Sequence, residues 1–442
     1  MTLIRHCIFT IWVMSLSFAC HEDLTSENPN QVSTEPASLI LWHALRGADH
    51  DHLKADLAQF QKQTGLLVKA LQLPHQAFAN KLQVSIPRGN GPDIFIGPHD
   101  RVGDWAEAGH IEAVSYWVSP KEYQRFMSSP LEAFTYKKQL YGLPLSCKAL
   151  ALFYNPQLVT KAPQTLTELV DVAKRFQRQS QASQSGEQVW GLAYPELDSL
   201  YFHAPWLHAF GATVLDQGQV NINHEAMHKS VALVKKLRDQ GLIPPEIDGA
   251  LASELFRQGK LAFLINGPWF IAELTDFDAS RWAVAPLPAL DEGLDERQPS
   301  EQHNKQSNKQ LLRPYLSVEG VMLSAYSKQM DKAWQLAQFL ASPELANHRQ
   351  KRGELIAYKK QSLAPYQATQ DHEFPAWQSV FQEQIQSAIP LSNDPQMKGL
   401  WTPMKRALGQ SILYGADIKE SFTEAEKAVF KQSGQGKGAQ HD

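Results

Sequence analysis

Three adjacent side chains with acid–base or hydrogen-bonding chemistry, His99, Asp100 and Arg101, follow an apolar stretch at residues 93–97. In open α/β sheets, ligands bind beyond the carboxyl ends of strands, so this position puts the three residues at a binding edge. The Asp100 carboxylate is suited to capping the following helix, and that role does not exclude contact with a ligand. The planar Arg101 guanidinium offers paired donors for hydroxyls or a carboxylate. We therefore expect Arg101 and Asp100 to hold a ligand, while His99 is structural.

A second strand end presents an aromatic side chain. In "INGPWF", Gly267-Pro268 turns the chain and Trp269 stands at the turn. A tryptophan in a turn usually packs against the core, but its place at a strand end favours contact with a ligand.

Catalytic motifs are missing from the sequence. There is no GxSxG, HExxH, phosphate-binding loop or GxGxxG with a suitable acidic partner. Ser146-Cys147-Lys148 has no visible partner base, so a buried strand cysteine is the better interpretation.

Metal ligation is the alternative for the histidines of "HALRGADHDH". His50 and His52 are two residues apart, which suits one face of a strand, whereas this segment begins a helix. No matching Cys/His pair lies downstream, so the sequence predicts neither a metal nor a cofactor. The nearby aspartates are favourable at a helix N-terminus.

Short apolar runs alternate with amphipathic segments along the chain. Strands are expected within residues 38–45, 66–73 and 92–97, with helices at 50–65 and after Asp100. Gly65 and Gly109 are expected to end these helices. The alternation predicts an α/β fold with mainly parallel sheets.

The length, the net charge and the first residues of the chain further limit the kind of protein it can be. The 442 residues suffice for two or three domains, and the net charge of −4 argues against a nucleic-acid binder. Residues 1–19 have a basic start and a short apolar run, typical of a signal peptide. Cys20 follows Ala19 in a lipobox-like pattern and is expected to carry a lipid. Residues 20–37 are polar and predict a flexible tether.

Five stretches together resemble a known family, namely residues 88–94, "PHDRVGDWAEAGHIEAV", "YGLPLSCKALALFYNPQLV", "GKLAFLINGPWF" and "DPQMKGLW". The chain resembles family 1 extracellular solute-binding proteins, in particular the maltose/maltodextrin-binding proteins of ABC importers. The resemblance implies an α/β, type II-like periplasmic-binding-protein fold with two lobes, a hinge and an interlobe ligand cleft. We expect an N-lobe at 38–146 and 321–366, and a C-lobe at 147–320 and 367–442. The hinge is expected near 147–149 and 318–322.

The resemblance also implies a site. Asp100 and Arg101 match an acidic–basic pair that binds sugar hydroxyls, and Trp269, Trp401 and Tyr201 match stacking aromatics. Arg46 stands where maltose binders carry an acidic–basic pair, and Lys148 replaces a hinge-region glutamate. These two cations suggest the hypothesis that the ligand carries an acidic group.

The function so implied is that of a non-enzymatic, monomeric receptor in the periplasm, anchored to the membrane through the lipid on Cys20. It would capture an oligosaccharide such as a maltodextrin and deliver it to ABC transporter permease subunits. Two alternatives remain, a signalling receptor subunit and a secreted glycosidase. A glycosidase would require a paired-carboxylate site.

Overall fold

The computed structural model describes residues 38–182, 188–195, 200–216, 218–291, 310–367 and 375–432. The predicted signal segment 1–19, the tether 20–37 and Cys20 lie outside these residues. Within them, none of the helices combines the length and the apolar character needed to cross a membrane.

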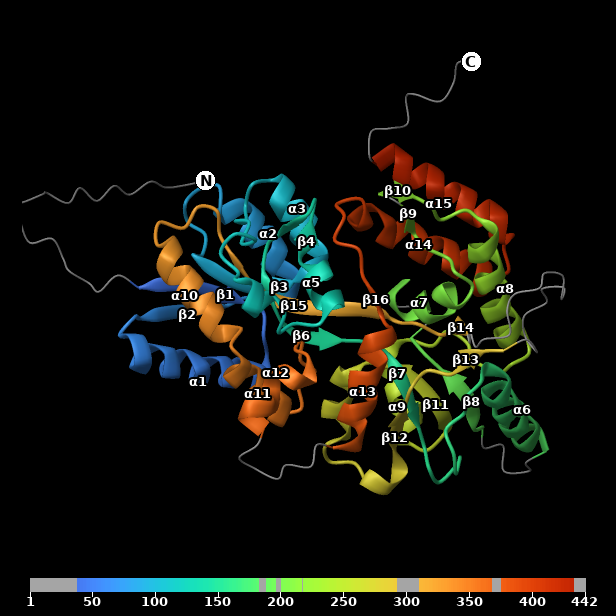
Figure 1. The fold of residues 1–442 in the computed structure, drawn as a ribbon. Helices are drawn as coiled ribbons and strands as arrows, with labels where there is room; N and C mark the ends of the chain where they lie inside the picture. The colour runs from blue at the N-terminus through green and yellow to red at the C-terminus, as the bar shows by residue number, and fades with distance from the viewer. Residues whose placement is uncertain are drawn as a thin grey trace, which may run out of the picture. The chain divides into compact units, whose positions relative to one another are not determined.

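A first α/β region is built on a six-stranded sheet with the order β16-β15-β3-β1-β2, in which β6 also pairs with β15 (Figure 1). Its strands are β1 (Leu39–His43), β2 (Val68–Gln72), β3 (Ile94–Pro98), β6 (Leu143–Lys148), β15 (Tyr315–Leu323) and β16 (Ile389–Pro390). Its helices and short strands are α1 (Gly47–Thr64), α2 (His75–Ser85), η1 (His99–Arg101), α3 (Val102–Glu107), α4 (Pro120–Tyr123), α5 (Ser128–Ala133), β4 (Thr135–Tyr136), β5 (Gln139–Leu140), α10 (Met330–Leu340), α11 (Pro343–Lys351) and α12 (Lys360–Gln367).

Helix α1 illustrates how the sequence dictates these elements. Leu53, Leu57 and Phe60 recur at helical spacing and are buried. Gly65 then adopts φ 73°, a left-handed conformation that favours glycine, and its N–H donates to the Gln61 carbonyl at 2.8 Å. The predicted end of this helix is therefore confirmed.

A second α/β region is built on a four-stranded sheet with the order β12-β7-β11-β8. Its strands are β7 (Ala151–Tyr154), β8 (Trp190–Ala193), β11 (Leu261–Asn266) and β12 (Ala283–Ala285), and its flanking helices are α6 (Leu166–Ala182), α9 (Gly249–Arg257) and α13 (Ala376–Ser387). A helical group packs beside them: α7 (Leu200–Ala209), α8 (Glu225–Asp239), α14 (Met397–Ile412) and α15 (Ile418–Gln432). Short elements complete the region: β9 (Leu215–Asp216), β10 (Gln219–Val220), η2 (Pro268–Leu274), η3 (Ala279–Arg281), β13 (Ala289–Leu290) and β14 (Gln310–Leu311).

The expectation of mainly parallel sheets is wrong, because both large sheets are mixed. Strand β1 runs parallel to β2 and β3, but β15 runs antiparallel to β3 and β6. In the second sheet β11 is parallel to β8 and antiparallel to β7. Strand β15 enters the first sheet after the chain has passed through the second region, so its direction is not set by a local strand–helix–strand unit.

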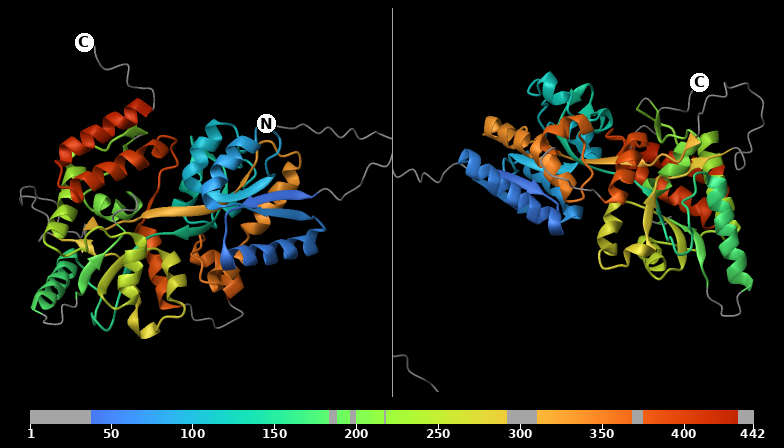
Figure 2. Two further views of the ribbon diagram at one scale, coloured as in Figure 1. Left: turned by 180° about the vertical axis from the view of Figure 1, so that it is seen from behind. Right: turned by 60° about the horizontal axis from the view of Figure 1, so that its bottom comes forward.

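Strands β6 and β15 join the two regions. Cys147 pairs with Val318 and Lys148 with Ser317, while the other half of β15 pairs with β3. Figure 2 shows β15, in orange, running between the blue and cyan elements of the first region and the green elements of the second.

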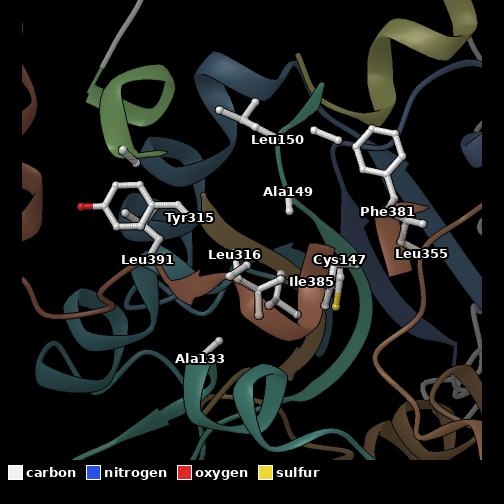
Figure 3. Close-up of a cluster of buried hydrophobic side chains, with 14 of the residues drawn as sticks. Ala133, Cys147, Ala149, Leu150, Tyr315, Leu316, Leu355, Phe381, Ile385 and Leu391 are labelled. Carbon is white, nitrogen blue, oxygen red and sulfur yellow. The ribbon is translucent and has the colours of Figure 1, made fainter. Parts of the chain in front are cut away.

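A buried apolar cluster surrounds this junction (Figure 3). It includes Cys147, Leu150, Leu316, Phe381 and Ile385, all of which are buried. Cys147 is a free thiol, and burial raises its pKa. The interpretation of Cys147 as a buried strand cysteine rather than a nucleophile is confirmed.

Candidate functional site

A cavity of about 530 Å³ lies where the ends of several elements meet. The first region contributes the residues after β1, one face of α2, the end of β3, η1 and α3, and the second region contributes α7 and α14. Lys148 of β6 and Ser317 and Glu319 of β15 also line it. The cavity brings together Asp100, Arg101, Tyr201 and Trp401, four of the residues that the sequence predicts for the site.

His99 fixes the edge that presents Asp100 and Arg101. Its ring is fully buried, its Nε2 lies 2.8 Å from the Leu391 carbonyl oxygen, and the Val318 amide nitrogen lies 3.1 Å from Nδ1. This geometry suits a neutral ring that donates from Nε2 and accepts at Nδ1. Burial accordingly lowers the pKa of His99. The predicted structural role of His99 is confirmed, and its purpose is to tie β3 to β15 and to the segment after β16.

The predicted capping role of Asp100 is wrong. Asp100 lies within η1, and Arg101 is the N-cap residue of α3, with no side-chain cap at that position. A short 3₁₀ turn that contains Asp100 precedes the helix, so α3 begins at Val102 and Arg101 takes the N-cap position. The Asp100 carboxylate therefore remains at the cavity wall.

Arg101 is held by Asp104, which lies in the first turn of α3. Its Nη1 donates to an Asp104 carboxylate oxygen at 3.3 Å, an i,i+3 pair in which both side chains are about three-tenths exposed. The ion pair orients the planar guanidinium at the cavity wall, where donors can meet a ligand hydroxyl.

Two aromatic side chains of the second region also form part of the cavity wall. Trp401 projects from α14 and Tyr201 from the first turn of α7, and both line the cavity. The ring centroid of Tyr201 lies 6.3 Å from that of Tyr315 on β15. Burial raises the pKa of Tyr201, so its hydroxyl stays protonated at neutral pH.

Trp269 and Arg46 do not line this cavity. Trp269 lies in η2 with 41% of its surface exposed, and it borders a neighbouring hollow of about 300 Å³. Its ring centroid is 6.2 Å from that of Tyr201, which connects the two hollows. Arg46 is exposed at the N-cap of α1.

Sequence reasoning missed two polar residues of the cavity, Ser317 and Glu319. They alternate with the buried residues Leu316, Val318 and Gly320 of β15, so a period-two pattern at the start of "YLSVEGVML" was the available signal. Lys148, one of the two cations behind the hypothesis of an acidic ligand, also lines the cavity, and its Nζ donates to Glu319 at 2.8 Å.

Gly97, at the end of β3, is closely packed against aromatic rings that line the cavity. A Cβ at this position would lie 3.2 Å from Phe78 and 3.5 Å from Trp105. Both aromatic residues also line the cavity, so the space at position 97 is already bounded by rings from α2 and α3.

A larger hollow of about 680 Å³ lies among α5, α12 and α13. It is lined by none of the predicted site residues, and α12 and α13 flank residues 368–374, which lie outside the described chain. We therefore place the candidate site in the 530 Å³ cavity.

The chemistry of that cavity is suited to holding a polar ligand with flat apolar faces. Lys148 is paired with Glu319 and Arg101 with Asp104, so opposite charges are largely matched within the wall. Rings at Tyr201 and Trp401 can cover C–H faces, while the charged groups form strong hydrogen bonds with hydroxyls.

Comparison with known proteins finds relatives that are named for oligosaccharide ligands. The galactooligosaccharide-binding protein of Bacillus subtilis is 26% identical over 408 residues, which cover 89% of each chain. The maltotriose-binding protein of Pyrococcus abyssi is 25% identical over 359 residues, 80% of this chain and 73% of that protein.

Solved structures show the same fold. The crystal structure of a cyclo/maltodextrin-binding protein complexed with maltotetraose matches with a TM-score of 0.75 and 26% identity, over 89% of this chain and 97% of the other. A Staphylococcus aureus extracellular solute-binding protein in complex with maltose matches with a TM-score of 0.73 at 24% identity, over 91% of this chain and 100% of the other. The fold is thus the two-lobed solute-binding fold expected from the sequence, and residues 48–347 match the family description itself. The chain belongs to the bacterial extracellular solute-binding protein family.

Proposed function

We propose that this protein captures a neutral oligosaccharide in the 530 Å³ cavity and delivers it to the permease subunits of an ABC importer. One observation supports the proposal: Asp100 and Arg101 line the same cavity as the rings of Tyr201 and Trp401. The names of the relatives support a sugar ligand, since they bind galactooligosaccharide and maltotriose.

The physical fit to a sugar follows from its two kinds of surface. Each pyranose ring has apolar C–H faces, which stack on aromatic rings, and an equator of hydroxyls, which need hydrogen-bond partners. Micromolar affinity corresponds to about −8 kcal/mol. A few stacking contacts and charge-assisted hydrogen bonds can supply this after the costs of ordering are met.

An acidic sugar is less well supported. Arg46, one of the two cations behind that hypothesis, is exposed and lies outside the lining of the cavity. Lys148, the other cation, is engaged by Glu319 at 2.8 Å. An anionic ligand would have to compete with that carboxylate, so we propose a neutral ligand.

Maltodextrins are the first candidates, as the sequence motifs imply. Galactooligosaccharides are the second, because the Bacillus subtilis relative that covers 89% of each chain is named for them.

We also propose that the lobes are formed by residues 38–146 with 321–366 and by 147–320 with 367–442. The paired strands β6 and β15 would act as the hinge, near residues 147–149 and 318–322. A ligand that contacts both lobes favours the closed arrangement because it gains contacts only there.

The proposal includes export and anchoring of a monomer. The signal at 1–19 would be removed and Cys20 lipidated, with residues 20–37 as the tether to the membrane. Mass spectrometry of membrane-extracted protein tests this step: an acylated Cys20 at the mature N-terminus supports it, and a cleaved but unmodified N-terminus contradicts it.

A panel of sugars tests the ligand. Thermal unfolding should shift upward with maltotriose, maltotetraose or a galactooligosaccharide, because a ligand that binds the folded state stabilises it. The Trp269→Ala and Trp401→Ala variants should each bind more weakly the sugar that stabilises the unmodified protein most. If neither does so, the site assignment is wrong.

Two further measurements separate the rival functions. Recovery of the oligosaccharide unchanged after prolonged incubation supports a receptor, whereas shortened products indicate a glycosidase. Ligand-dependent uptake in a strain that carries the permease supports transport, whereas a response only through a membrane sensor indicates signalling.

A further inference from the structure

A group of metal-ligating side chains gathers outside the sugar cavity, at the start of α1. Asp49 and His52 are three residues apart on this helix, a spacing that places them on the same face. Glu354, which follows α11, lies against them. One ligand atom from each of the three side chains lies within 4.8 Å of the other two.

The separation suits a small cation after a minor adjustment. Zinc bonds to histidine nitrogen and carboxylate oxygen are about 2.0–2.2 Å long, which in a tetrahedral site sets the ligand atoms roughly 3.4 Å apart. Rotation of the exposed Asp49 side chain can bring its oxygen closer, while the half-buried His52 and Glu354 provide the fixed part of the site.

His52 offers an uncommitted nitrogen. Its Nδ1 is shielded from solvent and has no hydrogen-bond partner. Shielded polar atoms without a partner are uncommon, and an ion that the structure does not contain is one of the recognised reasons for them. The Nδ1 of His50 is likewise unpartnered, but that ring stacks on His43 at 5.1 Å and does not belong to the cluster.

The surrounding charges leave room for a cation. Arg352 pairs with Asp56 at 3.4 Å and Lys148 pairs with Glu319 at 2.8 Å. Arg349, which also acts on Glu354, donates to the Leu340 carbonyl at 2.6 Å. Lys148 acts on both carboxylates of the cluster and Arg352 acts on Glu354, but each of these cations is already paired with another carboxylate.

We propose that Asp49, His52 and Glu354 form a binding site for a divalent transition-metal ion of the Zn²⁺ class, with water as the remaining ligand. One imidazole and two carboxylates match the donors that zinc accepts, whereas calcium and magnesium prefer oxygen ligands throughout.

The position of the site gives the ion a structural consequence. The segment that carries Glu354 contacts β6 directly, because the Cys147 N–H donates to the Leu355 carbonyl at 2.7 Å. A bound ion therefore links the start of α1 to the segment that supports the junction between the two regions.

The test uses the complete protein, stripped of metal with a chelator and titrated with Zn²⁺ against a chromophoric chelator. Replacing a group that hydrogen-bonds to a metal ligand commonly lowers metal affinity 10–100-fold, so loss of a ligand itself should cost at least roughly tenfold. His52→Gln and Glu354→Gln should each weaken binding by that factor. His50→Gln is the matched control and should bind as the unmodified protein does.

Titration with Co²⁺ supplies a second readout, because protein-bound Co²⁺ with four ligands absorbs visible light more strongly than Co²⁺ with six ligands. The band should appear with one equivalent in the unmodified protein and in His50→Gln, and be lost in His52→Gln. If Glu354→Gln does not fold, Asp49→Asn changes an exposed residue and replaces it in the test. Absence of tight Zn²⁺ binding, or equal binding in His52→Gln and His50→Gln, overturns the proposal.

Discussion

The two walls of the 530 Å³ cavity are built in different ways. In the first region, Asp100 and Arg101 follow directly from β3, and the buried His99 ring fixes their backbone. In the second region, Tyr201 and Trp401 stand on α7 and α14, helices far apart in the sequence. The charged wall is thus positioned by strand ends and hydrogen bonds, and the aromatic wall by helix packing.

This difference has an energetic consequence. Hydrogen bonds to a charged group are directional, so the first wall must be held rigidly to contribute. Stacking on an aromatic ring tolerates small displacements, because the ring presents a broad face. We therefore expect the charged wall to be sensitive to changes in its support, and the aromatic wall to be sensitive mainly to loss of a ring.

The largest expected effect is at the support of the charged wall. His99→Ala leaves the Leu391 carbonyl and the Val318 N–H without their partner and opens a void. The free energy of unfolding should fall by roughly 3–5 kcal/mol. Denaturant unfolding measures this loss, with the partly exposed His50→Ala as the control. Similar losses in both variants would show that His99 does not anchor the wall.

The next largest effect is a difference in oligosaccharide affinity between two arginine variants. Arg101 lines the cavity, whereas Arg46 was predicted from the sequence but lies outside the cavity lining. Arg101→Ala removes a charged donor and should weaken oligosaccharide binding by about 1.5–3 kcal/mol, or roughly 10–150-fold. Arg46→Ala changes an exposed residue outside the cavity and should leave affinity nearly unchanged. Calorimetric titration compares them, and the reverse order would place the ligand near Arg46.

Acid should weaken the first region through its buried histidines. Burial lowers the pKa of His43 to about 4, with His50 adding to the fall. Since the unfolded ring takes up a proton near pH 6.5 and the folded ring does not, stability is lost as the pH falls from about 6.5 toward 4. Between pH 7 and 5 the unmodified protein should lose on the order of 1–2 kcal/mol more than His43→Gln. Denaturant unfolding at pH 7 and pH 5 measures the loss for each protein. An equal loss of unfolding free energy in the unmodified protein and in His43→Gln would contradict this prediction.

The smallest effect concerns the edge of the aromatic wall. Trp269 borders the neighbouring hollow, and its ring centroid lies 6.2 Å from that of Tyr201. Trp269→Ala should weaken binding by less than about 1 kcal/mol, or a few-fold, which is less than the change at Trp401. A loss larger than that of Trp401→Ala in the same titration would move the centre of the site toward η2.

Local signals were sufficient for much of the fold. The helical spacing of Leu53, Leu57 and Phe60 and the stop at Gly65 correctly predicted α1, and the apolar run before His99 correctly predicted β3. Sheet direction was not predictable in the same way. Strand β15 pairs with β3 and β6 across well over a hundred residues, and no local pattern encodes that antiparallel entry.

Contacts between residues far apart in the sequence were also not predictable in the cavity and in the proposed metal site. Asp100 and Arg101 share one strand end, so their proximity was readable from the sequence. Glu319 and Lys148 meet only through the pairing of β15 with β6. The Asp49–His52–Glu354 cluster was missed because the histidine pair His50 and His52 was tested for metal spacing. The relevant spacing is the helical one between Asp49 and His52, completed by a residue about three hundred positions later.

Isothermal titration of the protein with maltotetraose, and with a galactooligosaccharide of similar length, tests the central claim most directly. We predict saturable binding of at least one of these neutral sugars with a stoichiometry of one. Trp401→Ala should weaken it by roughly 1–2 kcal/mol, while Tyr414→Ala, which changes a largely exposed ring just beyond the end of α14, should not. Failure of the folded protein to bind any neutral oligosaccharide, or equal affinity in the two variants and the unmodified protein, would contradict the account.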